Sequence, residues 1–234
     1  MQKIFDGTEK LIGKGAQADV FFYKGNAYKV FKPNYPLEWI DFEKRQQSAV
    51  NKANLSFVKY HDTADSHIVK MDFIDGVSLE SKMAELGLAG FSVLSNAFQK
   101  IHAADTRGLS IPRLSETAPI LLCENECEKV LPIIENLGKK YGECLCHLDL
   151  HFLNIMIEKN GDFQIIDWMN ARLAAAVFDY ARTYVVFSEV SDYVKKLYED
   201  TVLRDLKELN ITRADFESAT EVCQIFREKE KTGD

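Results

Sequence analysis

The strongest chemical signal in the sequence is a carboxylate and an amide five residues apart, followed by a second carboxylate. Residues 147–154 read His-Leu-Asp-Leu-His-Phe-Leu-Asn, which places Asp149 ahead of Asn154. Asp167 ends the apolar run Ile165-Ile166 and can be presented to a metal ion from the end of a strand. Phosphoryl transfer needs a carboxylate that orients and deprotonates a hydroxyl, and hard oxygen ligands for Mg²⁺. The spacing is therefore compatible with phosphoryl transfer.

A glycine-containing loop near the N-terminus is a second candidate feature. Residues 13–20 read Gly-Lys-Gly-Ala-Gln-Ala-Asp-Val between two predicted strands. Glycines let a backbone turn tightly and approach phosphate groups closely. The loop is followed by a strand, unlike a dinucleotide-binding loop, and it lacks the Gly-Lys-Ser/Thr ending of a P-loop. Taken alone, the pattern is weak, because most such glycine pairs are ordinary turns.

A lysine and a glutamate form the third feature. Strand alternation places Ala27, Lys29 and Phe31 on one face, where the small alanine leaves room for a flat base. A solvent-exposed strand lysine is the alternative interpretation. Glu43 lies on the inward stripe of a predicted helix, and a carboxylate there needs a compensating charge. We therefore predict an ion pair between Lys29 and Glu43.

The elements that must position these residues form a β-rich first part and a mainly helical second part. The pattern of the first part predicts strands at 9–13, 18–24, 27–31, 55–60 and 67–73 and a helix at 37–53. The second part is predicted to contain an apolar helical face from Val93 to Ile101, helices at 127–141, 178–189, 191–209 and about 213–229, and a hairpin of strands at 153–157 and 163–166. Pro132 is expected near the start of its helix, and Asn210 or Thr212 is expected to cap the last helix. The charge run 227–231 is expected to be a solvated, fraying helix end.

Composition narrows the class of protein further. The 234 residues are 46% hydrophobic with 12 Gly and 5 Pro, which fits a globular chain with a core. A net charge of −7 argues against a general nucleic-acid binder. No apolar run reaches the roughly 20 residues that span a bilayer, and the N-terminus lacks the apolar core of a signal peptide. We expect a cytoplasmic protein without membrane or nucleic-acid partners, whose five cysteines are reduced thiols.

Taken together, these motifs resemble the aminoglycoside phosphotransferase and choline kinase family, which has the protein-kinase-like fold. His-x-Asp-x-x-x-x-Asn followed by Ile-Asp-Trp carries the resemblance, which extends over nearly the whole chain. Residues 98–102 resemble the family's helix ending in Leu-His. Residues 179–183 resemble its Asp-Leu-Ala segment, in which the aspartate supports the catalytic loop.

The resemblance implies a role for each matched residue. Asp149 would be the catalytic base, Asn154 and Asp167 would hold Mg²⁺, and His147 would brace the loop. The nucleotide would be ATP, bound by the glycine loop, the lysine with its glutamate partner, and a hinge between two lobes. The residues expected to bind it are Gly13, Gly15, Val20, Ala27, Lys29, Glu43, Met71, Asp72, Phe73 and Ile74.

The resemblance also implies a two-lobed α+β fold. We expect a nucleotide-binding lobe of antiparallel sheet and one helix at residues 1–73, and a mainly helical catalytic and substrate-binding lobe at 74–234. The implied activity is ATP- and Mg-dependent phosphorylation of a hydroxyl on a small molecule that is aminoglycoside-, choline- or sugar-like. The acceptor could be cationic. The oligomeric state is not readable from the sequence.

Departures from the family pattern leave alternatives open. Leu148 replaces the usual glycine after the first histidine, Phe152-Leu153 replaces the usual pair before the asparagine, and residues 174–176 are three alanines. A protein kinase is one alternative, although Asp167-Trp168-Met169 stands where Asp-Phe-Gly is expected. A non-catalytic nucleotide-binding protein is another. A zinc site built from the cysteines and His147 is disfavoured by their irregular spacing.

Overall fold

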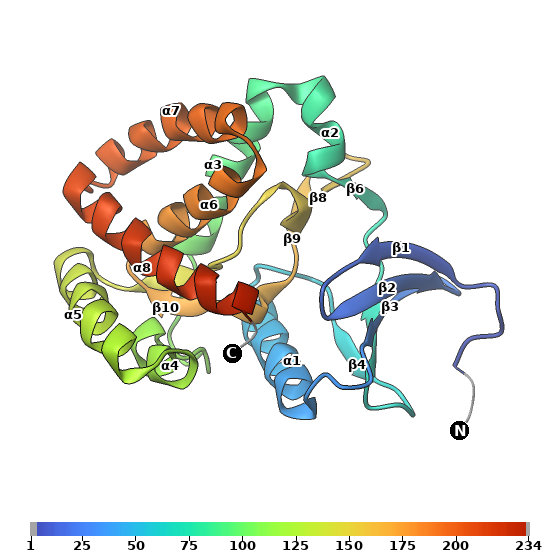
Figure 1. The fold of residues 1–234 in the computed structure, drawn as a ribbon. Helices are drawn as coiled ribbons and strands as arrows, with labels where there is room; N and C mark the ends of the chain where they lie inside the picture. Colours follow the sequence, from blue (N-terminus) through green and yellow to red (C-terminus); the bar gives the residue numbers. More distant parts are fainter. Residues whose placement is uncertain (1–3, 233–234) are drawn as a thin grey trace.

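The computed structural model describes residues 4–232. The outermost residues of the two predicted lobes, 1–3 and 233–234, therefore lie outside it. The fold is of the expected α+β class, with an antiparallel sheet and one helix followed by a mainly helical part. Figure 1 places the N-terminal sheet on one side of the molecule and the helices of the second part on the other.

The N-terminal sheet has five antiparallel strands in the order β1-β2-β3-β5-β4. Its strands are β1 (Lys10–Lys14), β2 (Ala18–Tyr23), β3 (Asn26–Phe31), β4 (Tyr60–Asp62) and β5 (Ile68–Asp72). Helix α1 (Leu37–Lys52) follows β3. Of the predicted inward stripe it buries Ile40, Glu43, Gln47 and Val50 and leaves Trp39 half-buried. The hairpin from β2 to β3 turns at Lys24 and Gly25, which both have positive φ.

The predicted strand at 55–60 is wrong, because only Tyr60 of that range belongs to a strand. The backbone carbonyl of Val58 accepts hydrogen bonds from Gln47 Nε2 (3.0 Å) and Asn51 Nδ2 (2.8 Å) on α1. Leu55 and Val58 are buried, which explains the apolar pattern. The segment is thus a half-buried loop, bound at Val58 by helix side chains and meeting β5 only at Lys59, whose carbonyl accepts from the Asp72 backbone at 3.2 Å.

The second part contains seven helices and two small sheets within the described residues. The helices are α2 (Leu79–Leu86), α3 (Leu88–His102), α4 (Leu114–Leu121), α5 (Glu124–Tyr141), α6 (Val177–Val190), α7 (Asp192–Glu208) and α8 (Arg213–Thr232). The strands are β6 (Gly76–Ser78), β7 (Cys144–Cys146), β8 (Ile155–Glu158), β9 (Phe163–Ile165) and β10 (Arg172–Ala174). The predicted hairpin is β8–β9, and β6 extends it into a three-stranded sheet, while β7 pairs with β10.

Two details of the helices differ from expectation. Helix α5 begins at Glu124, where Glu126 accepts a hydrogen bond from the Cys123 backbone at 2.9 Å. Pro132 therefore lies in the middle of α5 instead of near its start. The start of α8 agrees with expectation, since Thr212 caps it and its Oγ1 accepts a hydrogen bond from the Asp215 backbone at 3.2 Å. The end of α8 is not a solvated, frayed run, because Arg227 and Glu230 pair with Glu189 and Arg182 on α6.

Most of the apolar core lies in the second part, around α3 and α6. Phe98, Ile101 and Phe178 are almost fully buried there. A second, smaller cluster lies beneath the N-terminal sheet and consists of Ala18, Phe31, Ile40 and Val69. Helix α1 contributes to both cores, since Ala49 and Val50 pack into the large one. Helix α1 therefore connects the N-terminal sheet to the second part, which carries the loop at 147–154.

Candidate active site

The loop that follows β7 is held by one buried carboxylate. Asp179, at the start of α6, accepts hydrogen bonds from the backbone N–H groups of His147 (3.0 Å) and Leu148 (2.6 Å). His102 at the end of α3 contacts the same carboxylate, with Nε2 2.9 Å from Oδ2. Thr183 Oγ1 donates to the Leu150 carbonyl at 2.6 Å. Two side chains of α6 thus fix the backbone on both sides of Asp149, and His102 of α3 holds one of them, Asp179, in place.

Leu148 adopts a backbone conformation that favours glycine. Its φ is +57°, in the left-handed region, where an L-residue with a side chain is strained. The hydrogen bond to Asp179 and the adjacent His147, whose Nε2 lies 3.0 Å from the Ile166 carbonyl, fix this geometry. The loop therefore keeps a turn that glycine usually adopts, and the leucine at this position adds a side chain that lines the pocket described below.

Asp149 stands between two cationic or polar neighbours in a largely enclosed position. Its Oδ1 lies 3.7 Å from Arg182 Nη2, and its Oδ2 lies 3.8 Å from His151 Nε2. Burial raises the pKa of Asp149 above its ordinary value, and the charge of Arg182 opposes that shift. A carboxylate whose pKa is raised by burial holds a proton more strongly, which suits a group that must take one from a hydroxyl.

Asn154 and Asp167 are brought together by the β8–β9 hairpin. The Ile166 backbone donates to the Asn154 carbonyl at 3.0 Å, directly before Asp167. Asn154 Nδ2 donates to the Asp149 carbonyl at 2.9 Å, which fixes the orientation of the amide. Asp167 has φ +64°, and its side chain is 45% exposed. The pair offers an amide oxygen and a carboxylate, a donor set that fits Mg²⁺.

The predicted ion pair between Lys29 and Glu43 is present. Lys29 Nζ lies 2.6 Å from Glu43 Oε1 and 3.6 Å from Asp167 Oδ1. Burial alone would lower the pKa of Lys29, but the charges of Asp167 and Glu43 outweigh burial and raise it. The Lys29 ammonium in turn lowers the pKa of Asp167. A fully charged lysine thus connects the N-terminal sheet, α1 and the carboxylate after β9.

The glycine loop and the hinge segment flank β2 and β3. Gly15 donates its N–H to the Ala18 carbonyl at 2.9 Å, and a Cβ at Gly15 would lie 2.9 Å from that oxygen. Gly13 is opposite Val20 in the β1–β2 register and has no comparable conflict. The remaining sequence-predicted positions are Ala27 on β3, paired with Met71 on β5, Asp72 at the end of β5, and Phe73 and Ile74 in the link to β6.

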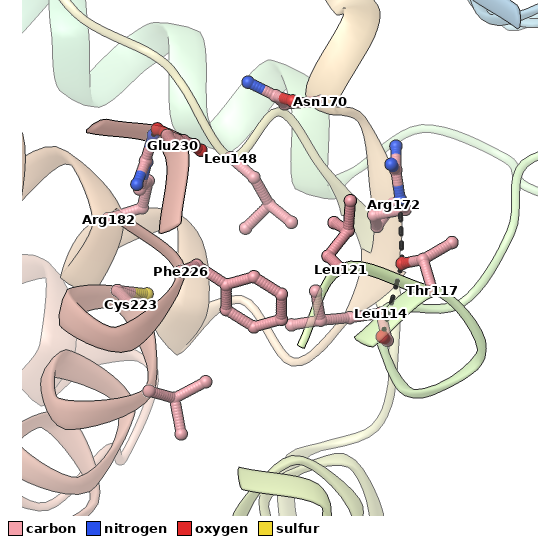
Figure 2. Close-up of a pocket in the computed structure, with 11 residues that line it drawn as sticks. Leu114, Thr117, Leu121, Leu148, Asn170, Arg172, Arg182, Cys223, Phe226 and Glu230 are labelled. Atoms are coloured by element: carbon pink, nitrogen blue, oxygen red, sulfur yellow. Dashed lines mark hydrogen bonds and ion pairs between the residues drawn. The ribbon is translucent and has the colours of Figure 1, made fainter. Parts of the chain in front are cut away.

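A pocket opens beside the loop at 147–154, next to Leu148 and Arg182. It is formed by α4, β10, α6 and α8, and Figure 2 shows Leu148, Leu121 and Phe226 pointing into one space. Arg182 and Glu230 stand at one edge of it and Arg172 at the other. Neither Arg182 nor Glu230 is among the site residues predicted from the sequence. An arginine inside an apolar helix, three residues after Asp179, is the signal that could have indicated Arg182.

The cysteines are not grouped around His147, as a zinc site with this histidine would require. His147 Nε2 contacts the Ile166 carbonyl, whereas Cys144 and Cys146 lie beside His102, with their ligand atoms within 4.8 Å of one another. Both thiols contact the Ala174 carbonyl, at 3.7 Å and 3.5 Å. All five cysteines are free thiols.

Comparisons with known proteins bear on the family and on the fold of the chain. The phosphotransferase enzyme family (APH) matches residues 81–209. No curated protein sequence matches the chain significantly. No helix among the described residues is long and apolar enough to span a membrane.

Solved structures match the chain closely in fold at low sequence identity. The ethanolamine kinase of Plasmodium vivax has a TM-score of 0.65 at 14% identity, covering 96% of this chain and 75% of that one. The choline kinase LicA of Streptococcus pneumoniae has a TM-score of 0.56 at 17% identity, with 97% and 87% covered. A thermostable mutant of aminoglycoside phosphotransferase APH(4)-Ia, in a ternary complex with ADP and hygromycin B, has a TM-score of 0.61 at 14% identity, with 97% and 88% covered.

Proposed function

The chain belongs to the phosphotransferase enzyme family, and on that basis we propose that it transfers a phosphoryl group from ATP to a hydroxyl of a small molecule. The observation that carries the proposal is the cluster of Lys29, Glu43 and Asp167, with Asp149 and Asn154 joined to it through the β8–β9 hairpin. Phosphoryl transfer requires positioning and charge stabilisation more than covalent chemistry by the protein. These five polar residues supply both.

In this proposal each residue acts at a stated atom. Lys29 Nζ binds the phosphates of the nucleotide and is held in place by Glu43 Oε1. Asp149 orients the acceptor hydroxyl and takes its proton. Asn154 and Asp167 would hold Mg²⁺, which when bound neutralises negative charge on the phosphates. Arg182, 3.7 Å from Asp149 Oδ1, favours the ionised base before the hydroxyl arrives.

We assign the nucleotide to the N-terminal lobe, residues 1–73, and the acceptor to residues 74–234. Gly13, Gly15 and Val20 would cover the phosphates, and Ala27 would face the base. Met71, Asp72, Phe73 and Ile74 would supply backbone groups at the adenine edge. The structures of related proteins in complex with ADP and AMP-PNP support an adenine nucleotide as the phosphoryl donor. An acceptor of the aminoglycoside, amino-alcohol or sugar type is the starting set for the assay.

The experiment is an ADP-release assay with Mg-ATP and a panel of aminoglycosides, amino alcohols, sugars and hydroxy acids. Asp149→Asn is expected to lower the rate by a factor of about 10² or more, because general-base catalysis contributes roughly that much. ATP binding, measured by thermal shift, should persist in this variant. Asp200→Asn, an exposed substitution on α7, is the matched control and should leave the rate unchanged.

Three results would contradict the proposal. A chain that does not bind Mg-ATP lacks the phosphoryl donor. Turnover that survives Asp149→Asn would show that Asp149 is not the base. Binding of Mg-ATP without ADP release for any acceptor in the panel would favour a non-catalytic nucleotide-binding protein.

A further inference from the structure

The pocket beside Asp149 has a composition that restricts the acceptor. Its cavity is small, about 50 Å³, well below the roughly 300–1,000 Å³ of sites that enclose a whole small molecule. It has room for one group of the acceptor, and the rest of the acceptor would extend through the open mouth. Most of its wall is apolar, formed by Leu114, Leu121, Leu148, Val222 and Phe226. Its charged lining is two arginines, Arg172 and Arg182, against the single carboxylate of Glu230.

Arg182 carries hydrogen-bond donors that the protein leaves unused. Its side chain is only 4% exposed. Nη2 contacts Glu230 Oε2 at 2.5 Å and approaches Asp149, whereas Nε and Nη1 are buried without a hydrogen-bond partner among the described residues. A buried guanidinium with unpaired N–H groups is costly, and the cost is removed when an oxygen-rich ligand accepts from them.

Arg172 provides a second positive charge on the opposite wall. Its Nε donates to Thr117 Oγ1 at 3.0 Å, and its Nη1 donates to the Ala171 carbonyl at 2.8 Å, so the side chain is fixed in place. Burial lowers the pKa of Arg172 to about 10, which still leaves it charged at neutral pH. A polycation placed in this pocket would meet two fixed positive charges and one carboxylate.

Glu230 occupies the position where a ligand carboxylate would be expected. It comes from the last turn of α8, is 40% exposed, and is shared between Arg182 and Arg227. Because Glu230 is exposed and Arg182 is not, the carboxylate can leave toward solvent while the guanidinium stays. The glutamate would then yield its place on Arg182 to an anion of the acceptor.

We infer that the phosphate acceptor is a hydroxy compound with an apolar body and an anionic group, a carboxylate or phosphate, which Arg182 binds next to Asp149. This inference rests on the proposed function and names the substrate class of the same site. An anionic acceptor would distinguish this chain from kinases whose acceptors are polycations. Leu148 and Phe226 would contact the apolar body, and the hydroxyl would face Asp149.

Three probes of one shape test the inference: 4-(hydroxymethyl)benzoate, its neutral amide, and 4-(hydroxymethyl)benzylamine. Binding is measured by calorimetry without nucleotide and again with a non-hydrolysable ATP analogue, and transfer is followed by ADP release. The benzoate is expected to bind about tenfold or more tightly than the amine, the difference that a charge-assisted hydrogen bond supplies. The amide should fall between them.

Variants of Arg182 and Glu230 test whether Arg182 is responsible for the preference for the benzoate. Arg182→Gln should weaken benzoate binding about tenfold or more and leave amide binding nearly unchanged. Glu230→Gln should strengthen benzoate binding severalfold, because the competing carboxylate is removed, and it keeps the test usable should Arg182→Gln not fold. Arg213→Gln, at an exposed arginine paired with Glu217 on α8, is the matched control.

The inference fails if the amine binds more tightly than the benzoate, if no carboxylate probe binds, or if Glu230→Gln leaves benzoate affinity unchanged. Binding and turnover are read separately. Benzoate binding without ADP release would count against the proposed transfer and leave the pocket assignment intact. Transfer to the amine with tighter binding would keep the function and overturn the anionic class.

Discussion

At the scale of single residues, the left-handed backbone at Leu148 leads to a testable reversal of the usual order of stability. Glycine normally costs about 0.5–1 kcal/mol relative to alanine. At φ +57° the order should invert, so Leu148→Gly is expected to be about 1 kcal/mol more stable than Leu148→Ala. Urea denaturation of both variants measures the difference. The same pair at Leu153, an exposed position outside the positive-φ residues, should keep the usual order. An equal or lower stability of Leu148→Gly would show that the turn is unstrained.

Residues also differ in how far the sequence could reveal them. The pairing of Lys29 with Glu43 was predictable, because an inward-facing carboxylate in a short chain needs a cation and the adjacent strand offers one. Arg182 and Glu230 were not predictable, because they are 48 residues apart and Glu230 stands in a charge run that usually marks a solvated helix end. Only the packing of α8 against α6 brings them together. Whether the predicted site residues bind nucleotide and metal stays a prediction for the assays above.

At the scale of elements, His102 and Asp179 link the end of α3 to the start of α6 and should make stability depend on pH. Burial alone would lower the pKa of His102, but the hydrogen bond and charge of Asp179 outweigh burial and raise it above the ordinary 6.5. The folded state therefore holds this proton to a higher pH than the unfolded chain. Its contribution to the free energy of unfolding is complete below pH 6.5 and is lost as the pH rises through the raised pKa.

The melting temperature of wild type and His102→Gln, followed from about pH 6 to pH 9, measures this contribution. The difference between the two should be largest at the acidic end and should shrink as the pH rises. His61→Gln, at a half-exposed histidine on β4, is the matched control. A difference that is constant with pH would mean that His102 acts through packing alone.

The longer helices were predictable from the sequence, whereas several of the shortest strands were not. The predicted bounds of α1, α6 and α7 differ from those in the structure by about one residue. The three-residue strand β9 could be predicted because a turn at Asn160-Gly161 marks it as half of a hairpin. The strands β6, β7 and β10 have three residues each, too few for alternation to be seen. The loop at 55–59 was mistaken for a strand because burial of Leu55 and Val58 gives the same apolar pattern in either conformation.

At the scale of the whole molecule, two apolar cores of unequal size predict unequal local stability. The cluster under the N-terminal sheet has four buried members, whereas the cluster around α3 and α6 is several times larger. The sheet is connected to the rest mainly by α1, by the link after β5 and by the Lys29–Asp167 contact. Gln46 on α1 adds one hydrogen bond to the Ala171 carbonyl, with Nε2 2.5 Å from the oxygen. Because few contacts join the two cores, the sheet should open without unfolding of the helical part.

Hydrogen exchange with two matched core truncations on α1 tests this. Ile40→Ala removes a large member of the small cluster and should speed amide exchange in β1, β2 and β3 while α6 keeps its protection. Val50 lies further along the same helix and belongs to the large core. Val50→Ala should therefore lower protection in both parts. Mg-ATP should restore protection of the sheet in Ile40→Ala, because a ligand that binds across Lys29 and Asp167 ties the two parts together. Equal loss of protection in β2 and α6 upon Ile40→Ala would mean that the chain opens only as one unit, and that the contacts through α1 are stronger than their number suggests.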